Sequence, residues 1–214
     1  MLESATGLVL RTRPLTETSL IVHWLTPTLG RVATVAKGAR RPKSSFFGKL
    51  DVCYLADFSF SRSRHSELHT LREVSLRETN NFLRKDLGYL QQAAYCVRLI
   101  EQATEIETPL ATVFALLSGI LTVLPAQPPR PQMVFGFELK FLCELGLKPE
   151  LSDTTLSPGA KALVKHLEQV DWPGIANLRL TAPQRTELGR FLQRFLTFHL
   201  GRIPGGREHA IDWA

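Results

Sequence analysis

The sequence predicts an α+β protein in which a five-stranded barrel precedes an all-helical C-terminal domain. Two patterns predict this order. Short runs rich in β-branched and aromatic residues fill the first 80 residues, whereas apolar residues recur every three or four positions after Asn80. The chain has 214 residues, 44% of them hydrophobic and 21% charged, so it can bury a core. We therefore expect a barrel domain at 1–80 and a helical domain at 81–214.

Five runs in the first part are expected to be strands. They cover residues 5–11, 18–26, 30–38, 52–61 and 67–78. A tight hairpin is predicted at 26–30, where Pro27 fixes φ early and Gly30 supplies a positive φ at the end. Five short antiparallel strands, with a long loop between the third and the fourth, are typical of the OB-fold, a Greek-key barrel. A generic SH3-like barrel would produce almost the same pattern.

Five helices are expected in the second part, at about 86–107, 108–125, 132–145, 157–170 and 183–200. Thr108 and Pro109 suit the N-cap and the first turn of the second helix. Thr181 and Gln184 have the spacing of a capping box at the start of the fifth. The tail, 203–214, contains two adjacent glycines and is expected to be frayed.

Basic side chains are concentrated in the first part of the chain. Residues 1–80 carry 12 basic and 7 acidic side chains, a net charge of +5, while the whole chain has a net charge of +6. The segment 18–50 has no acidic residue but six bases, which are Arg31, Lys37, Arg40, Arg41, Lys43 and Lys49. Such a field attracts polyanions, because a base beside a phosphate releases a condensed counterion. A solvated loop with surplus bases is the alternative interpretation.

Patterns typical of catalysis are absent from the sequence, which has no P-loop, Rossmann fingerprint or nucleophile elbow. His65 and His69 are four residues apart on an expected strand, about 13 Å and too far to share a metal ion. Three scattered cysteines fit neither a disulfide framework nor a CxxC zinc site. No segment is long and apolar enough to span a membrane, and the N-terminus is no signal peptide. We expect a cytoplasmic, non-enzymatic binding protein without catalytic residues, metal or cofactor.

Several segments share a recognisable pattern. The most specific is 35–44, which has the sequence VAKGARRPKS; the others are 7–10, 17–22, Thr26 with 29–30, 135–139, 145–146 and 156–160. Together they resemble the RecO family of bacterial DNA repair proteins over essentially the whole chain. Many members carry a four-cysteine zinc module between the third and fourth helices. Here that stretch, 147–156, is ten residues long and has no cysteine, so no zinc is expected.

The resemblance implies a mediator of DNA repair and recombination with an N-terminal OB-fold and a helical C-terminal domain. Such proteins act on the nucleoid. They bind single- and double-stranded DNA, anneal complementary strands and work with RecR to load RecA onto strands coated by single-strand-binding protein, whose C-terminal tail they contact. For the 35–44 motif, the resemblance implies that Lys37, Arg40, Arg41 and Lys43 contact phosphates. Arg31 and Lys49 are weaker candidates, and Phe46 or Phe47 is a candidate for stacking on bases.

An alternative function is a non-enzymatic adaptor, whose basic loop meets an acidic peptide and for which contact with DNA is incidental. Arg130 and Lys140 flank an apolar helix that could receive the C-terminal carboxylate and an anchoring Phe of such a tail. Packing of this helix in the core would produce the same apolar pattern.

Overall fold

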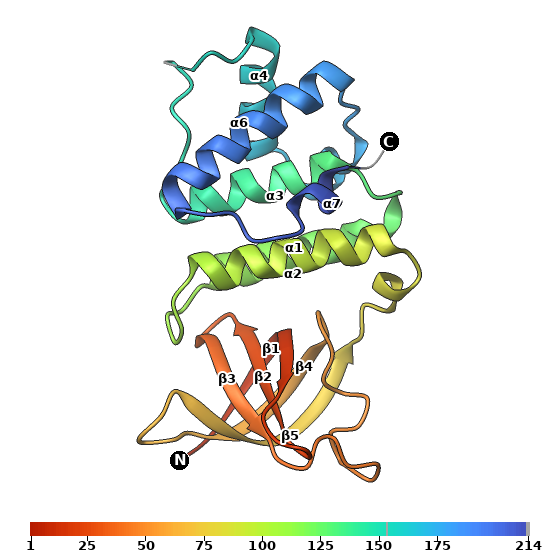
Figure 1. The fold of residues 1–214 in the computed structure, drawn as a ribbon, viewed down its shortest axis with the longest axis vertical. Helices are drawn as coiled ribbons and strands as arrows, with labels where there is room; N and C mark the ends of the chain where they lie inside the picture. Colours follow the sequence, from red (N-terminus) through yellow and green to blue (C-terminus); the bar gives the residue numbers. More distant parts are fainter. Residues whose placement is uncertain (153, 213–214) are drawn as a thin grey trace. The chain divides into compact units, whose positions relative to one another are not determined.

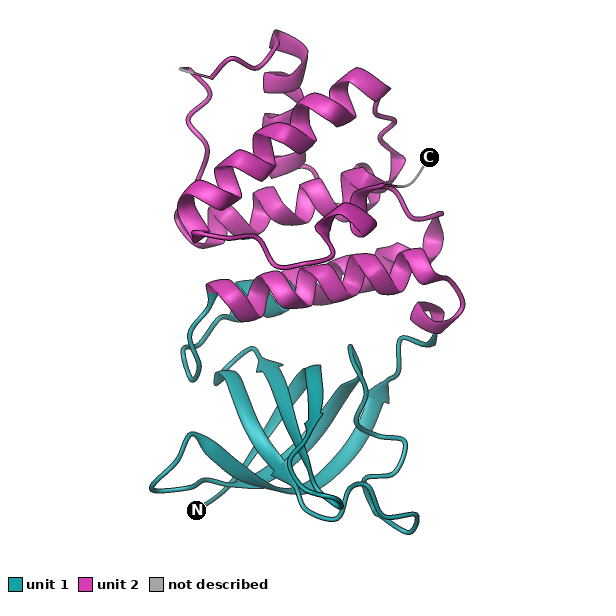
Figure 2. Ribbon diagram, in the orientation of Figure 1, with its two compact units in different colours: residues 1–81, 104–115 teal, residues 82–103, 116–214 magenta. Residues whose placement is uncertain are grey.

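The computed structural model describes residues 1–152 and 154–212. It divides into two compact units, shown in different colours in Figure 2. The first, the barrel unit, contains residues 1–81 and 104–115, and the second, the helical unit, contains residues 82–103 and the chain from residue 116 onward. The segment 104–115 thus groups with the barrel, while the domain boundary at residue 80 stays a prediction.

Five strands curl into the closed barrel of the first unit (Figure 1). They are β1 (Leu2–Pro14), β2 (Leu20–Thr26), β3 (Gly30–Ala36), β4 (Leu55–Ser61) and β5 (Leu68–Glu78). Their order around the barrel is β1-β2-β3-β5-β4, and every pairing is antiparallel except that of β3 with β5. The expected α+β fold class, an OB-like five-stranded barrel followed by helices, is confirmed.

Alternating side chains of these strands fill the barrel core. In β3, Val32, Thr34 and Ala36 are buried, which is the period-2 pattern of a strand with one inward face. The ring of Trp24 stacks on Phe58 with a centroid separation of 4.1 Å, and its Nε1 donates a hydrogen bond of 2.9 Å to the Thr34 hydroxyl. The core is therefore aromatic, and its one indole N–H is satisfied inside it.

The segment 104–115 is fixed to the start of β3. Ile106 forms an isolated bridge with Arg31, and the Glu107 N–H donates to the Arg31 carbonyl at 2.8 Å. Gly30, with φ +67°, lies so close to the Thr108 backbone that a Cβ would overlap it. The absence of a side chain at Gly30 is thus what lets this segment approach the barrel.

The helical unit is built around a buried helix, α3. Its elements are η1 (Asn81–Arg84), α1 (Leu87–Ala103), α2 (Ala111–Val123, which begins in the barrel unit), η2 (Leu124–Ala126), α3 (Pro131–Glu144), α4 (Pro158–Gln169), α5 (Trp172–Asn177), α6 (Ala182–Leu200) and α7 (Arg207–Ile211). α3 contacts α1, α4, α5, α6 and α7. Residues 131–139 of α3 are all buried, the polar Gln132 and Glu138 included, so this part of the helix is covered around its whole circumference.

Three features differ from those expected. α2 begins at Ala111, so Thr108 is not its N-cap. α5 was not predicted, although the Asp171 side chain caps it by accepting from the Gly174 N–H at 2.9 Å. The tail was expected to be frayed, which is wrong for 207–211, because α7 forms there and buries Arg207. The last two residues of the predicted tail, 213–214, lie outside the described residues.

Candidate nucleic-acid interface

The basic loop, residues 37–54 between β3 and β4, is an ordered chain of turns. The Arg41 N–H donates to the Gly38 carbonyl, and the Ser44 N–H donates to the Arg41 carbonyl, each at 3.0 Å. Gly38 begins this path with φ +70°, a conformation that suits glycine. Ala39 and Phe46 are buried in the barrel core and anchor the loop at two points. Side chains between these anchors are thereby presented on a fixed backbone.

Four bases of this loop are exposed: Lys37, Arg40, Arg41 and Lys43. Arg40 is additionally held, since its N–H donates to the Thr18 carbonyl at 3.0 Å and its Nη1 donates to the Thr16 carbonyl at 3.1 Å. The structure therefore brings together, on one ordered loop, all four residues of the 35–44 motif that were expected to meet phosphates.

The two candidate stacking residues lie in different environments. Phe46 is 8% exposed and packs in the barrel core, so its ring has no face open to a base. Phe47, the next residue, is 73% exposed. Neighbouring side chains at this turn point to opposite sides, and only Phe47 remains a stacking candidate.

Arg31 and Lys49 make contacts apart from the exposed bases. The Arg31 guanidinium donates to the Thr104 carbonyl and so helps to hold the 104–115 segment. Lys49 Nζ donates to the Val74 carbonyl of β5 at 3.2 Å. Both side chains are only partly exposed, and each uses at least one donor for the fold.

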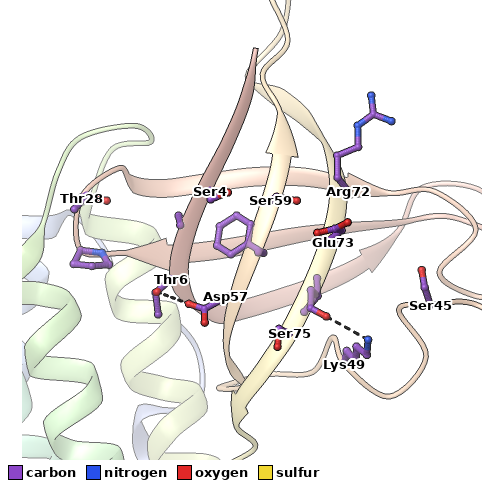
Figure 3. Close-up of a pocket in the computed structure, with 14 residues that line it drawn as sticks. Ser4, Thr6, Thr28, Ser45, Lys49, Asp57, Ser59, Arg72, Glu73 and Ser75 are labelled. Atoms are coloured by element: carbon purple, nitrogen blue, oxygen red, sulfur yellow. Dashed lines mark hydrogen bonds between the residues drawn. The ribbon is translucent and has the colours of Figure 1, made fainter.

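A shallow cleft of about 760 Å³ lies over β1, β4 and β5 beside the basic loop (Figure 3). Its lining is rich in hydroxyl groups, which belong to Ser4, Thr6, Thr28, Ser45, Ser59 and Ser75. Hydrogen bonds from the Thr6 hydroxyl, at 2.6 Å, and from Arg77 lower the pKa of Asp57. The lining also includes the basic residues Lys49 and Arg72 and the acidic residue Glu73, so side chains of both charges border this cleft.

His69 is engaged with a carboxylate. Its Nε2 lies 2.7 Å from Glu107 Oε1, and its Nδ1 accepts from the Ser63 N–H at 3.3 Å. Arg62 pairs with both Glu3 and Glu107, and this network connects β1, β5 and the 104–115 segment. Within residues 1–152 and 154–212, no three His, Cys, Asp or Glu side chains are grouped so that they could hold a metal ion.

The structure does not bring Arg130 and Lys140 into one open groove. Arg130 is the N-cap of α3 and Lys140 lies ten residues further along, so their backbones are about 15 Å apart along the helix axis. Lys140 Nζ donates to the Glu168 carbonyl at 2.9 Å, and burial lowers the pKa of its ammonium group. The Arg130 carbonyl accepts from Gln92 Nε2 at 2.9 Å. Because α3 is covered on all sides, its apolar residues are core residues and form no exposed peptide-binding face.

Sequence reasoning missed a second basic group on the barrel, formed by Arg11, Arg13 and His23 on β1 and β2. The available signal was the position of Arg11 and Arg13 directly after the apolar run 8–10; residues 7–10 are buried and residues 11–14 are exposed. Two arginines alone were too weak a pattern, because only strand pairing brings them beside His23.

Comparisons with known proteins agree with the resemblance seen in the sequence. The family description "Recombination protein O N terminal" matches residues 1–80, and "Recombination protein O C terminal" matches residues 84–156. The DNA repair protein RecO of Anaeromyxobacter sp. (strain K) is 35% identical over 237 aligned positions, which cover 95% of this chain and 93% of the relative. The chain belongs to the RecO family of DNA repair proteins.

Other RecO proteins match with similar identity. RecO of Anaeromyxobacter dehalogenans (strain 2CP-C) is 29% identical over the same share of both chains. RecO of Bacillus subtilis is 30% identical over 71% of this chain and 59% of its own. Membership of the RecO family supports a role in DNA repair and recombination. In the part of the chain that the structure describes, no helix is long and apolar enough to cross a membrane.

Proposed function

We propose that this RecO-family chain is a recombination mediator that binds single- and double-stranded DNA through the basic loop. The observation that carries the proposal is the exposure of Lys37, Arg40, Arg41 and Lys43 on one ordered loop. No acidic residue within 18–50 offsets their charge. Contacts of this kind go to phosphates and carry no base information, so we expect binding to be independent of sequence.

Charge neutralisation also supplies a mechanism for annealing. Two single strands repel each other through their phosphates, and a protein that neutralises phosphates while leaving base edges accessible lowers the cost of their meeting. This action needs no nucleophile, general base or metal, so we propose that the protein is not an enzyme. Family resemblance extends the proposal to partners: RecR, the tail of single-strand-binding protein and, indirectly, RecA.

The test removes the four charges and measures the salt dependence of binding. We expect the variant Lys37→Gln/Arg40→Gln/Arg41→Gln/Lys43→Gln to bind labelled single-stranded DNA more weakly. Each lost phosphate contact reduces the slope of log K against log salt by about 0.7, so the slope should fall by roughly 3. Glutamine removes the charge without introducing repulsion.

A matched control separates position from total charge. Arg64, Lys85, Lys165 and Arg179 are exposed and are also two lysines and two arginines. Their quadruple Gln variant has the same net charge as the loop variant and should keep the wild-type slope. An equal decrease of the salt slope in both variants would show that binding depends only on total charge. It would contradict the assignment of the basic loop as the DNA-binding site.

Stacking by Phe47 is tested with the same assay. Phe47→Ala should weaken binding of single strands by about 1–3 kcal/mol, the usual contribution of a base stacked on an aromatic ring, without changing the salt slope. A variant that binds as tightly as the wild type would remove Phe47 from the interface. Annealing of complementary strands, with and without bound single-strand-binding protein and RecR, then tests the proposed activity and partners.

A further inference from the structure

One side of helix α6 is exposed and carries both charged and aromatic residues. α6 packs on α3 and α4 (Figure 1). Its buried side chains are Leu188, Leu192 and Leu196. Arg190, Arg194 and Phe198 are exposed, Phe198 to 83%. Because an α-helix has 3.6 residues per turn, these three share one side of α6, roughly opposite the buried leucines.

An open cleft of about 700 Å³, which we call the α6 cleft, lies beside the first half of this helix. Its apolar lining consists of Leu156, Ala182, Pro183 and Phe191. Phe198 lies fifteen residues after Pro183, which is about 22 Å along the helix axis. Within one chain the exposed ring therefore cannot enter the apolar cleft, since a rigid helix keeps them apart.

The charges on this side of α6 suit a second α6 that runs antiparallel to the first. In a pair related by a two-fold axis, each contact occurs twice, with the same two residues exchanged between the copies. When the axis lies midway between positions 190 and 191, residues equally far from it in opposite directions face each other. Glu187 of each copy then lies opposite Arg194 of the other. Opposite charges meet in both halves of such a pair.

The same axis also serves the exposed ring. Pro183 and Phe198 are equally far from it, so Phe198 of each copy reaches the α6 cleft of the other copy. At the axis itself, Arg190 meets the Phe191 ring of the second copy, which is a cation–π arrangement. A single register thus buries both exposed rings and pairs the charges, and loss of apolar surface from water stabilises the pair.

Both charged groups are able to form this contact. Arg194 has no hydrogen bond or ion pair with another residue of 1–152 or 154–212. Glu187 accepts from the Ser157 N–H at 2.6 Å and from the Ser157 hydroxyl at 2.8 Å, and these bonds lower its pKa. They use one position on each carboxylate oxygen out of about four in total, so a guanidinium can still bind.

We propose that two copies of this chain associate through α6 as an antiparallel two-fold pair, with Phe198 of each copy in the α6 cleft of the other. A second copy is the partner that the observations favour, because one surface holds both the exposed ring and the cleft that fits it. The same surface holds both members of the ion pair.

Such a dimer has a consequence for annealing, and this step rests on the proposed function. Each dimer carries two basic loops, so one assembly can hold both strands. Arg194→Glu leaves the basic loop unchanged. We therefore expect this variant to bind single strands as the wild type does but to anneal them more slowly.

The first test measures the mass of the protein in solution by sedimentation equilibrium without DNA. The mass should rise from 24.0 kDa to twice that value as the concentration increases. Phe198→Ala should raise the dissociation constant about 30-fold or more, as loss of a central interface residue does. Phe47→Ala removes the other highly exposed phenylalanine and should dimerise as the wild type does. A wild type of 24.0 kDa at every concentration up to about 1 mM would overturn the proposal.

The second test exchanges the charges between the copies. Arg194→Glu and Glu187→Arg each place like charges opposite each other, so each variant alone should be monomeric. An equal mixture of the two restores opposite charges at both contacts and should dimerise. Arg179→Glu, at an exposed position of the same unit, is the control and should dimerise as the wild type does. A mixture that stays monomeric, although both variants keep the wild-type helical circular dichroism, would refute the register and the proposal.

A third measurement separates the dimer from a DNA contact, because arginine and phenylalanine side chains also bind single strands. A monomeric wild type, together with weaker binding of oligothymidylate by Phe198→Ala, would assign this side of α6 to DNA and show that the dimer is wrong. The mass is measured without DNA, so failure of the dimer leaves the role of the basic loop intact. Unchanged DNA binding by the loop variant would likewise leave the dimer intact.

Discussion

Replacing Arg207 by Met should strongly destabilise the helical unit. Arg207 Nε and Nη2 donate to the two carboxylate oxygens of Glu138 at 2.6 and 2.9 Å, and Nη1 donates to Gln193 Oε1 at 3.1 Å. The Tyr95 hydroxyl donates to the same carboxylate at 2.6 Å. Glu138 is fully buried and Arg207 is 5% exposed, so water cannot replace the lost guanidinium.

The expected loss of stability follows from the charge left behind. Removing one member of a buried pair strands the other in a medium of low polarity, which costs about 3–5 kcal/mol. If the tail 203–214 were frayed, as the sequence predicts, Arg207 would be exposed. The substitution would then lower the free energy of unfolding by no more than about 0.5 kcal/mol, which is usual for exposed positions. The two expected losses of stability therefore differ by a factor of about six or more.

Native-state hydrogen exchange measures the loss in each unit separately. Amides of α1 and α3 should exchange about 10²- to 10⁴-fold faster in the Arg207→Met variant, the factor that corresponds to 3–5 kcal/mol. Amides of the barrel provide an internal control in the same sample. Arg202→Met replaces an exposed arginine directly before this tail; it is the matched variant and should exchange as the wild type does.

A second substitution identifies the buried charge as the cause. Glu138→Gln in the Arg207→Met background removes the stranded carboxylate and keeps an acceptor for Tyr95, so it should restore much of the lost protection. Equal exchange in the Arg207→Met and Arg202→Met variants would refute the reasoning. A double variant no more protected than the single one would show that lost packing, and not charge, is responsible.

Two further predictions concern the barrel. Arginine hydrogen bonds contribute to the lowered pKa values of Glu3 and Asp57, so these carboxylates stabilise the barrel above their ordinary pKa, near 4, and that stability is lost as the pH falls further. Melting midpoints should drop between pH 6 and pH 3, less steeply for Glu3→Gln, and a flat profile would contradict this. Gly30→Ala should lower thermal stability by more than Gly48→Ala, because both glycines have a positive φ but only at Gly30 would a Cβ overlap the Thr108 backbone. Equal losses of thermal stability in the two variants would show that the positive φ, and not the contact with Thr108, causes the effect.

Local patterns predicted most of the elements. Alternation in 30–36 and the capping box at Thr181 are properties of short stretches, and the structure has β3 and α6 at those places. α7 could not be predicted in this way, because it has five residues and no side-chain cap. Its arginine is held by Glu138, which lies 69 positions away in the chain.

Part of the candidate site could likewise be predicted from the sequence, and part could not. The acid-free segment 18–50 and the four bases of the 35–44 motif are visible without a structure. The burial of Phe46 beside the exposed Phe47 is not, because it depends on which side of the turn faces the barrel core. The same holds for α3, the apolar helix that contains Lys140. Its own pattern does not reveal that the neighbouring helices cover it.

The sequence by itself determined the order of strands before helices, the concentration of positive charge in the first 80 residues and the family of the protein. Each is contained in composition, period or motif, which depend on neighbours in the chain. Only the tertiary structure decided that Arg11, Arg13, His23 and Arg31 line one cleft, and that the 104–115 segment joins the barrel. Those outcomes depend on strand register and barrel closure, which bring together residues that are distant in sequence.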